Sequence, residues 1–154
     1  MASTLSARQG RALERTLIET FHRARWQESG GTPVCPECFD WHDVRPDLKN
    51  RQYRPNLRMY LCTCCDRRFT DLYESPLHHT KAPLLQWAIA LLLPPLQKYA
   101  ALPRAQTGIA RATLTTMQAR LHGTPTAARW TQELAGAGIT VEQLIAAILK
   151  RRQS

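Results

Sequence analysis

The sequence predicts a mostly α-helical protein that carries a small β zinc ribbon. Two C-x-x-C pairs, Cys35/Cys38 and Cys62/Cys65, are separated by 23 residues, which is the spacing of a zinc ribbon. Apolar residues recur at helical spacing before and after this segment but not within it. We therefore expect four parts: an N-terminal amphipathic helix over residues 1–30, a four-cysteine zinc ribbon over 31–75, a helix-turn-helix region over 76–123 and C-terminal helices over 124–154.

The first helix is predicted over residues 5–28. Its apolar positions recur every three or four residues, while its arginines lie largely on other faces. The Gly30–Gly31 pair, followed by Pro33, is expected to end it. The apolar positions are Leu13, Leu17, Phe21 and Ala24.

The cysteine pairs are predicted to hold a structural Zn²⁺. Each pair can form a tight turn that presents two thiolates, and two turns complete a tetrahedral site with no open position for water. A disulfide and thiol catalysis are the alternatives, although a redox C-x-x-C motif normally occurs once, near a βαβ pattern that is not visible here. Cys64 is the odd cysteine, and the positions of Tyr60 and Phe69 favour Cys62 with Cys65 as ligands.

The rest of the ribbon segment has little regular pattern. Asp43 to Pro55 is polar and turn-rich, and residues 57–61 alternate like a short strand. We interpret Tyr60 and Phe69 as packing behind the metal. The arginines of this segment are predicted to contact nucleic acid, and solvated side chains are the alternative.

A buried helix is predicted after Pro83, because apolar residues cover most of its circumference. Pro94–Pro95 break it, and residues 96–102 are expected to resume for two turns. The segment 103–121 then reads as a helix-turn-helix, with Gly108 at a turn that needs a positive φ and Ile109 filling the junction. Three further residues should face inward: Leu114, Met117 and Leu121.

The outward positions of the second helix in this motif are suited to nucleic acid. Arg111, Thr115 and Gln118 can read base edges. No acidic residue occurs between Glu74 and Glu133, which suits helices held against phosphates. Two packed helices with basic solvent-facing sides remain the alternative. The outward set is Arg111, Ala112, Thr115, Thr116, Gln118, Ala119 and Arg120.

Two more helices are expected near residues 125–135 and 140–152. In the second, Thr140 can cap the N-terminus and Gln143 can reciprocate three residues later. Its apolar stripe comprises Val141, Leu144, Ile145, Ile148 and Leu149.

The charge composition favours a nucleic-acid partner. The formal net charge is +9, and the basic residues are 17 Arg against 4 Lys. Arginine grips phosphate and guanine bidentately, although an arginine-rich proteome would give the same bias. The most apolar run, residues 84–93, is too short to span a membrane. No signal peptide is apparent, and metal-type cysteine spacing fits a reducing compartment, so we expect a cytoplasmic, nucleoid-associated protein in a bacterium.

A family resemblance rests on Tyr60-x-Cys62-x-x-Cys65-x-x-x-Phe69, then Ser75-Pro76-Leu77, a helix with Trp87 and the Gly108 motif. This pattern resembles the N-terminal half of bacterial insertion-sequence transposases, and the likeness covers about residues 35–121. It implies a zinc ribbon and a helix-turn-helix that binds the terminal repeats of the element. Tyr73-Glu74-Ser75 stands where the family usually has Thr-Gly-Thr. The family also continues into a two-metal catalytic domain, but only Glu133 and Glu142 follow the motif here.

The expected function is therefore zinc-dependent binding of double-stranded DNA by a transcriptional regulator or a transposase-derived accessory factor, without enzymatic activity, small-molecule substrate or membrane. A homodimer is expected, because one recognition helix discriminates little. The terminal helices are its candidate surface, and packing of these helices on the bundle is the alternative. The alternatives are an adaptor that binds an acidic protein, and RNA binding with Tyr53 and Trp41 stacking on bases. The predicted DNA contacts are Arg104, Arg111, Thr115, Gln118, Arg120, Arg51, Arg54, Arg58, Arg67 and Arg68.

Overall fold

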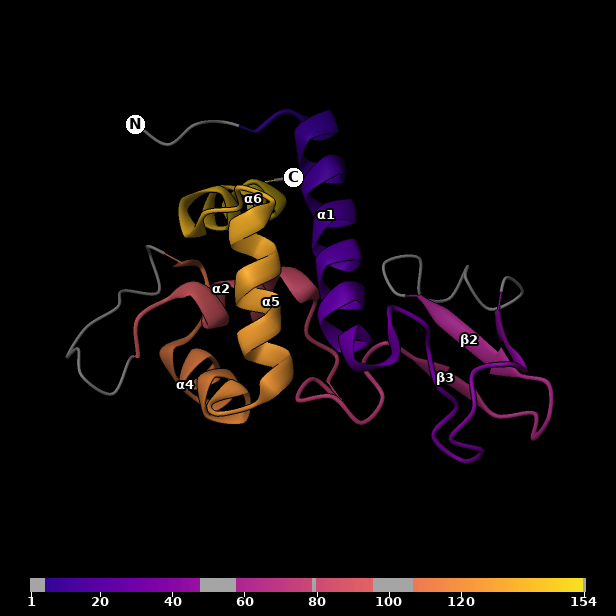
Figure 1. Cartoon of the computed structure of the whole chain (residues 1–154). Helices are drawn as coiled ribbons and strands as arrows, with labels where there is room; N and C mark the ends of the chain where they lie inside the picture. Colours follow the sequence, from indigo (N-terminus) through magenta and orange to yellow (C-terminus); the bar gives the residue numbers. More distant parts are fainter. Residues whose placement is uncertain (1–4, 48–57, 79, 96–106, 154) are drawn as a thin grey trace.

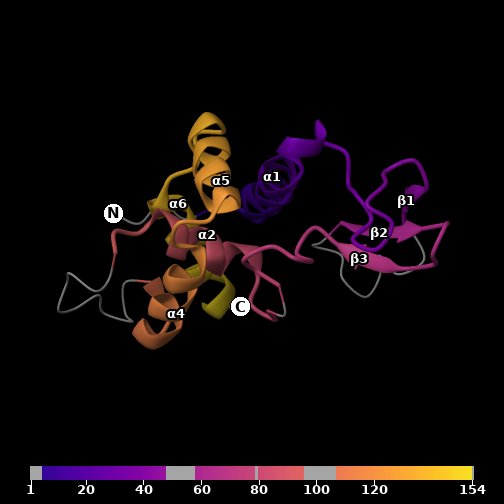
Figure 2. The same cartoon turned by 60° about the horizontal axis from the view of Figure 1, so that its bottom comes forward.

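The computed structural model describes residues 5–47, 58–78, 80–95 and 107–153. These residues form five α-helices and one three-stranded antiparallel sheet, as the sequence predicts at this level. The helices are α1 (Ala7–Arg25), α2 (Leu84–Leu92), α4 (Arg111–Leu121), α5 (Pro125–Gly136) and α6 (Val141–Gln153), and the strands are β1 (Val44–Pro46), β2 (Met59–Cys62) and β3 (Arg68–Thr70). Figures 1 and 2 show the sheet set beside the helices, past the C-terminal end of α1. We call the helices the helical body, and residues 31–47 and 58–75 the cysteine lobe.

Helix α2 is the centre of the helical body. It contacts α1, α4, α5 and α6. Because other helices surround α2, most of its circumference is buried. Its buried residues are Leu85 and the four residues from Trp87 to Ala90. The prediction of a buried helix is confirmed. Pro83 immediately precedes its first residue and Pro94 follows its C-cap, so prolines bound the helix at both ends.

Helix α1 packs lengthwise on α5 through aromatic side chains. Phe21 meets Trp130 edge to face, with ring centroids 5.0 Å apart. The buried indole Nε1 of Trp130 donates to Oγ1 of Thr20 at 3.1 Å, so its polar atom is satisfied inside the core. A reciprocal cap between Ser6 and Gln9 begins α1.

The turn before α4 has the predicted backbone. Gly108 has φ 71°, and Ile109 behind it is buried. Leu114, Met117 and Leu121 are also buried, which confirms the inward face of this helix. The helix expected before this turn, over residues 96–102, and Arg104 lie outside the described residues.

The C-terminal helices follow the predicted pattern. The amide of Thr140 donates to the side chain of Gln143 at 3.1 Å, and the amide of Gln143 donates to the Thr140 hydroxyl at 3.4 Å, so the predicted capping box is present. The apolar faces of α1 and α6 are buried within the helical body. A dimer through the terminal helices would therefore use their outer, polar faces.

The sheet has the order β1-β2-β3, with Tyr60 opposite Pro46 on one side and Phe69 on the other. Strand β2 lies where an alternating strand was predicted, and Tyr60 and Cys62 are its buried positions. Strand β1 lies in the segment that we interpreted as turn-rich, and β3 was not anticipated. Both are three residues long, which is too short for a clear alternating pattern.

The cysteine lobe has a small core of its own. Trp26, Cys35, Tyr60, Cys62 and Phe69 form this buried cluster. Because Trp26 follows the last residue of α1, this helix contributes to both cores and joins them. None of the described helices is long and apolar enough to cross a membrane.

Candidate metal centre

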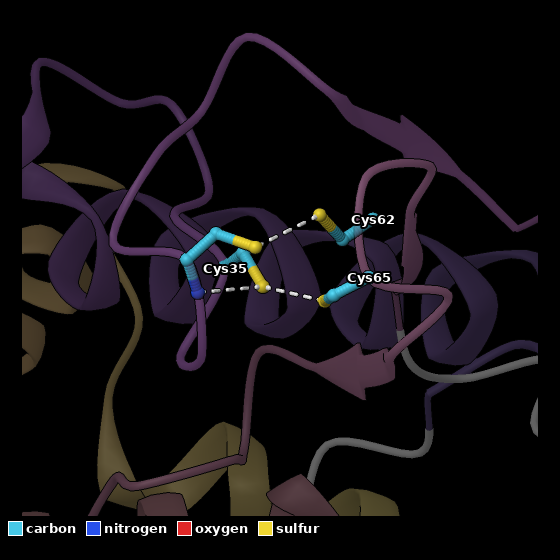
Figure 3. Close-up of side chains that lie close together, drawn as sticks. Cys35, Cys62 and Cys65 are labelled. Carbon is cyan, nitrogen blue, oxygen red and sulfur yellow. Dashed lines mark hydrogen bonds between the residues drawn. The ribbon is translucent and has the colours of Figure 1, made fainter.

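Four cysteine sulfurs lie together between the two turns of the cysteine lobe. The Sγ atoms of Cys35, Cys38, Cys62 and Cys65 are all within 4.8 Å of one another. Cys35 and Cys65 are 3.6 Å apart and Cys38 and Cys62 are 3.9 Å apart, and Figure 3 shows the sulfurs of Cys62 and Cys65 facing the first turn. A tetrahedral ion with metal–sulfur bonds of about 2.3 Å needs sulfur–sulfur edges of about 3.8 Å. The four cysteines are thus close enough to hold a metal ion.

The same distances disfavour a disulfide. A sulfur–sulfur bond measures about 2.05 Å, and all five cysteines are free. Cys64 is exposed and is not part of the cluster. The choice of Cys65 over Cys64 therefore agrees with the structure.

Both cysteine turns have the same backbone design. The amide of Cys35 donates to the carbonyl of Asp40 at 2.9 Å, and the amide of Cys62 donates to the carbonyl of Arg67, also at 2.9 Å. In each turn the residue after the second cysteine is left-handed, with φ 55° at Phe39 and 58° at Asp66. In each turn this residue reverses the chain next to the clustered sulfurs.

The neighbouring thiols shift the pKa values of Cys35 and Cys38 in opposite directions. The thiol of Cys65 is the largest influence that raises the pKa of Cys38 above its usual range. At Cys35, burial opposes ionisation, but the backbone amides of Cys38 and Glu37 and two neighbouring thiols outweigh it and lower the pKa. A divalent cation held by these four sulfurs would take the place of their protons.

Aromatic rings cover the buried side of the cluster. Trp26 meets Phe69 edge to face at 6.3 Å, and Phe69 lies 5.3 Å from Tyr60. The interpretation of Tyr60 and Phe69 as packing residues is confirmed by their burial beside Cys35 and Cys62.

A buried carboxylate connects this lobe to α1. Oδ1 of Asp71 accepts hydrogen bonds from Nε1 of Trp26 and from the hydroxyl of Tyr60, both at 2.7 Å. His22 on α1 approaches the other oxygen at 3.2 Å. Burial, together with the charge of Asp71, raises the pKa of Tyr60 above its usual range. This cluster was missed from the sequence, because no local pattern marks Asp71 as buried.

The residues of α4 that we predicted to read DNA differ in exposure and in hydrogen-bond partners. Arg111 is exposed in the first turn. The hydroxyl of Thr115 donates to the carbonyl of Arg111 at 2.9 Å. Gln118 is half-buried, and its Nε2, which carries two N–H donors, lies within hydrogen-bond distance of three carbonyls at and just after the end of α2. These belong to Ala90, Leu93 and Pro94, at 3.1, 3.3 and 3.1 Å.

Several predicted arginines have partners within the protein. Arg120 donates to the carbonyl of His78 and lies over the ring of Trp87. In the cysteine lobe, Arg67 pairs with Glu37 at 2.8 Å and Arg68 with buried Asp47 at 3.2 Å. Arg58 is exposed, next to β2, whereas Arg51 and Arg54 lie outside the described residues.

The structure does not bring these residues together as one surface. Figures 1 and 2 place α4 and the sheet on opposite sides of the molecule. The predicted contacts in the described residues thus divide into a set on α4 and a set on the cysteine lobe. No protein-family model, curated protein or solved structure matches this chain.

Proposed function

We propose that this protein binds double-stranded DNA, with Zn²⁺ held by the four cysteines and α4 placed in the major groove. The observation that carries the proposal is the construction of α4. It follows a left-handed glycine, is anchored by three buried side chains and has an exposed outer face without carboxylates. This is the arrangement that a helix-turn-helix needs for its recognition helix.

Zinc is the metal that best suits the cysteine cluster. Four thiolates in a tetrahedral arrangement select Zn²⁺ or iron–sulfur chemistry, and a closed site of this kind contributes folding free energy. The core of the lobe contains five buried residues, too few to hold three short strands without support. The metal therefore acts on DNA binding indirectly, through the fold of the lobe.

Base contacts are assigned to the N-terminal part of α4. Arg111 can fork onto guanine, and half-buried Thr115 lies one turn later on the same side of the helix. Gln118 is engaged with α2, so we assign it the role of fixing α4 in place. The N-terminus of α4 has no side-chain cap and no acidic residue in its first turn, which favours an approaching phosphate.

The acid-free segment extends this surface. Residues 75–132 contain no Asp or Glu, and exposed Lys81 precedes α2. The lobe arginines would add phosphate contacts only if the duplex extended past the end of α1, because they lie on the other side of the molecule. We propose a regulator or a transposase-derived accessory factor that dimerises on DNA, since a single helix reads few base pairs.

The test is selection from a library of random double-stranded DNA by the zinc-loaded chain, at several salt concentrations. We expect binding that weakens steeply with salt and an enriched motif. Arg111→Ala should lower affinity for that motif about 5- to 100-fold. The matched control is Arg8→Ala, because Arg8 is exposed in the first turn of α1, at the far end of the helical body from α4. Absence of an enriched motif, or equal losses in the two variants, would refute the proposal.

A further inference from the structure

Two aromatic side chains on the first cysteine turn face solvent. Phe39 is 83% exposed and Trp41 is 51% exposed, and they are the large hydrophobic residues that the described part of the chain leaves exposed. Trp41 stacks on the neighbouring ring of His42, with centroids 3.9 Å apart, and does not enter the core of the lobe. Single exposed apolar residues are common, so exposure by itself does not indicate a binding site.

The backbone at Phe39 is unfavourable for its residue type. Its φ of 55° lies in the left-handed region, where glycine is free and where Asp and Asn are tolerated through local hydrogen bonds. The equivalent position of the second turn is occupied by Asp66, which suits that conformation. The backbone of a phenylalanine is strained in this conformation. Because the ring is 83% exposed, its burial adds little stability to offset that strain. The folding of the turn therefore does not account for Phe39.

A hollow of about 280 Å³ lies beside Phe39, between the end of α1 and the first cysteine turn. This volume is just below the range of about 300–1,000 Å³ that is typical of small-molecule sites. It suits the insertion of a single side chain better than a cofactor. Its apolar lining consists of Trp26, Val34, Pro36, Phe39, Phe69 and Tyr73.

The segment that carries the first cysteine turn is acidic, although Arg25 from the end of α1 also lines the hollow. Residues 28–44 contain four carboxylates and no Lys or Arg, whereas the chain has a net charge of +9. Glu28 and Glu37 are paired with Arg129 and Arg67, which leaves Asp40 and Asp43 beside the two exposed rings. If the proposed Zn²⁺ is bound, four thiolates and one divalent cation add further negative charge at the base of the turn.

We propose that Phe39, Trp41 and the adjacent hollow bind a segment of a partner protein that inserts one apolar side chain and carries Lys or Arg next to it. Aromatic anchors beside a pocket are typical of binding hot spots, and the carboxylates supply the complementary charge. The same carboxylates repel nucleic acid. This surface therefore differs in chemistry from α4, and it calls for a basic partner where the sequence suggested an acidic one.

The probe is a display library of random dodecapeptides, selected on the full chain loaded with zinc. We expect enrichment of peptides with an aliphatic or aromatic residue next to Lys or Arg. Phe39→Gly should weaken binding of a selected peptide about tenfold or more. The same variant should keep its metal content and have an equal or higher melting temperature, because glycine adopts the left-handed backbone without strain. Asp43→Asn should weaken binding less and reduce its dependence on salt.

The matched control is Asp66→Gly, which makes the same backbone change at the equivalent position of the second turn and leaves both exposed rings in place. It should retain peptide binding. Three results would overturn the proposal: no enrichment or enrichment of acidic peptides, peptide binding that survives Phe39→Gly, or loss of metal or melting temperature in Phe39→Gly. Preferential binding of single-stranded nucleic acid that depends on Phe39 would also overturn it, in favour of base stacking.

Discussion

Replacement of Asp71 should reveal how strongly the cysteine lobe is attached to α1. Asp71 is 1% exposed, and one of its oxygens accepts short hydrogen bonds from Trp26 and Tyr60. Asp71→Ala removes the acceptor and leaves the indole N–H of Trp26 buried without it, while the hydroxyl of Tyr60 keeps only Nδ1 of His22, 3.0 Å away. Asp71→Asn keeps an oxygen at the same position, so both donors retain their acceptor.

The contacts of Asp71 determine how much each variant should lower the free energy of unfolding. A hydrogen bond to a charged group contributes about 1.5–3 kcal/mol, and the desolvation of the carboxylate offsets part of the sum of two. We therefore expect Asp71→Ala to lower the free energy of unfolding by about 3–5 kcal/mol. Asp71→Asn loses the charge but not the geometry, and it should cost about 1 kcal/mol.

The assay is urea unfolding with zinc in excess, followed by tryptophan fluorescence, since Trp26 reports directly on the junction. Glu19→Ala is the control, because Glu19 is an exposed carboxylate on α1. Equal losses for Asp71→Ala and Asp71→Asn, or a loss below about 1 kcal/mol for Asp71→Ala, would refute the reasoning that this carboxylate is a structural acceptor.

Three further predictions follow from particular side chains. Cys65→Ser should lose most of the bound zinc, measured by elemental analysis after dialysis, while Cys64→Ser keeps it, because only Cys65 belongs to the cluster. Equal zinc content in the two variants would contradict the ligand assignment. Gln118→Glu should lower the free energy of unfolding by about 2–3 kcal/mol, since a carboxylate would replace a donor that faces three carbonyls. An unchanged urea midpoint with weaker DNA binding would instead assign Gln118 to base reading. Trp130→Ala should cost about 3–5 kcal/mol in thermal unfolding followed by circular dichroism, because Trp130 is fully buried between α1 and α5. A loss below about 1 kcal/mol would indicate that the α1–α5 contact is dispensable.

The helices were predictable because each has a local signal. The apolar spacing of Leu13, Leu17 and Phe21 marks α1, and prolines bound α2. The left-handed turn at Gly108 and the capping box at Thr140 are also local features, set by residue types a few positions apart. The cysteine cluster was predictable for a similar reason, since two short turns with fixed spacing specify which four cysteines come together.

The strands β1 and β3 were not predictable with the same certainty. Each has three residues, and its pairing with β2 depends on partners far along the chain. The partners of Gln118 and Arg120 could not be predicted from the sequence either. The carbonyls that they contact belong to α2 and to the segments next to it. We assigned both residues to the outward face, but Gln118 lies four residues after Leu114 and three before Leu121, so it borders the buried side of α4.

By itself, the sequence determined the order of the helices, which four cysteines cluster and the basic, acid-free segment around α4, because these depend on residue type and short-range spacing. The tertiary structure alone decided what joins the two cores and what stays exposed. Asp71 receives its donors from Trp26, next to the end of α1, and from Tyr60 on β2, and Phe39 remains 83% exposed. Burial and long-range hydrogen bonding are properties of the folded chain, since they depend on residues brought together from distant positions.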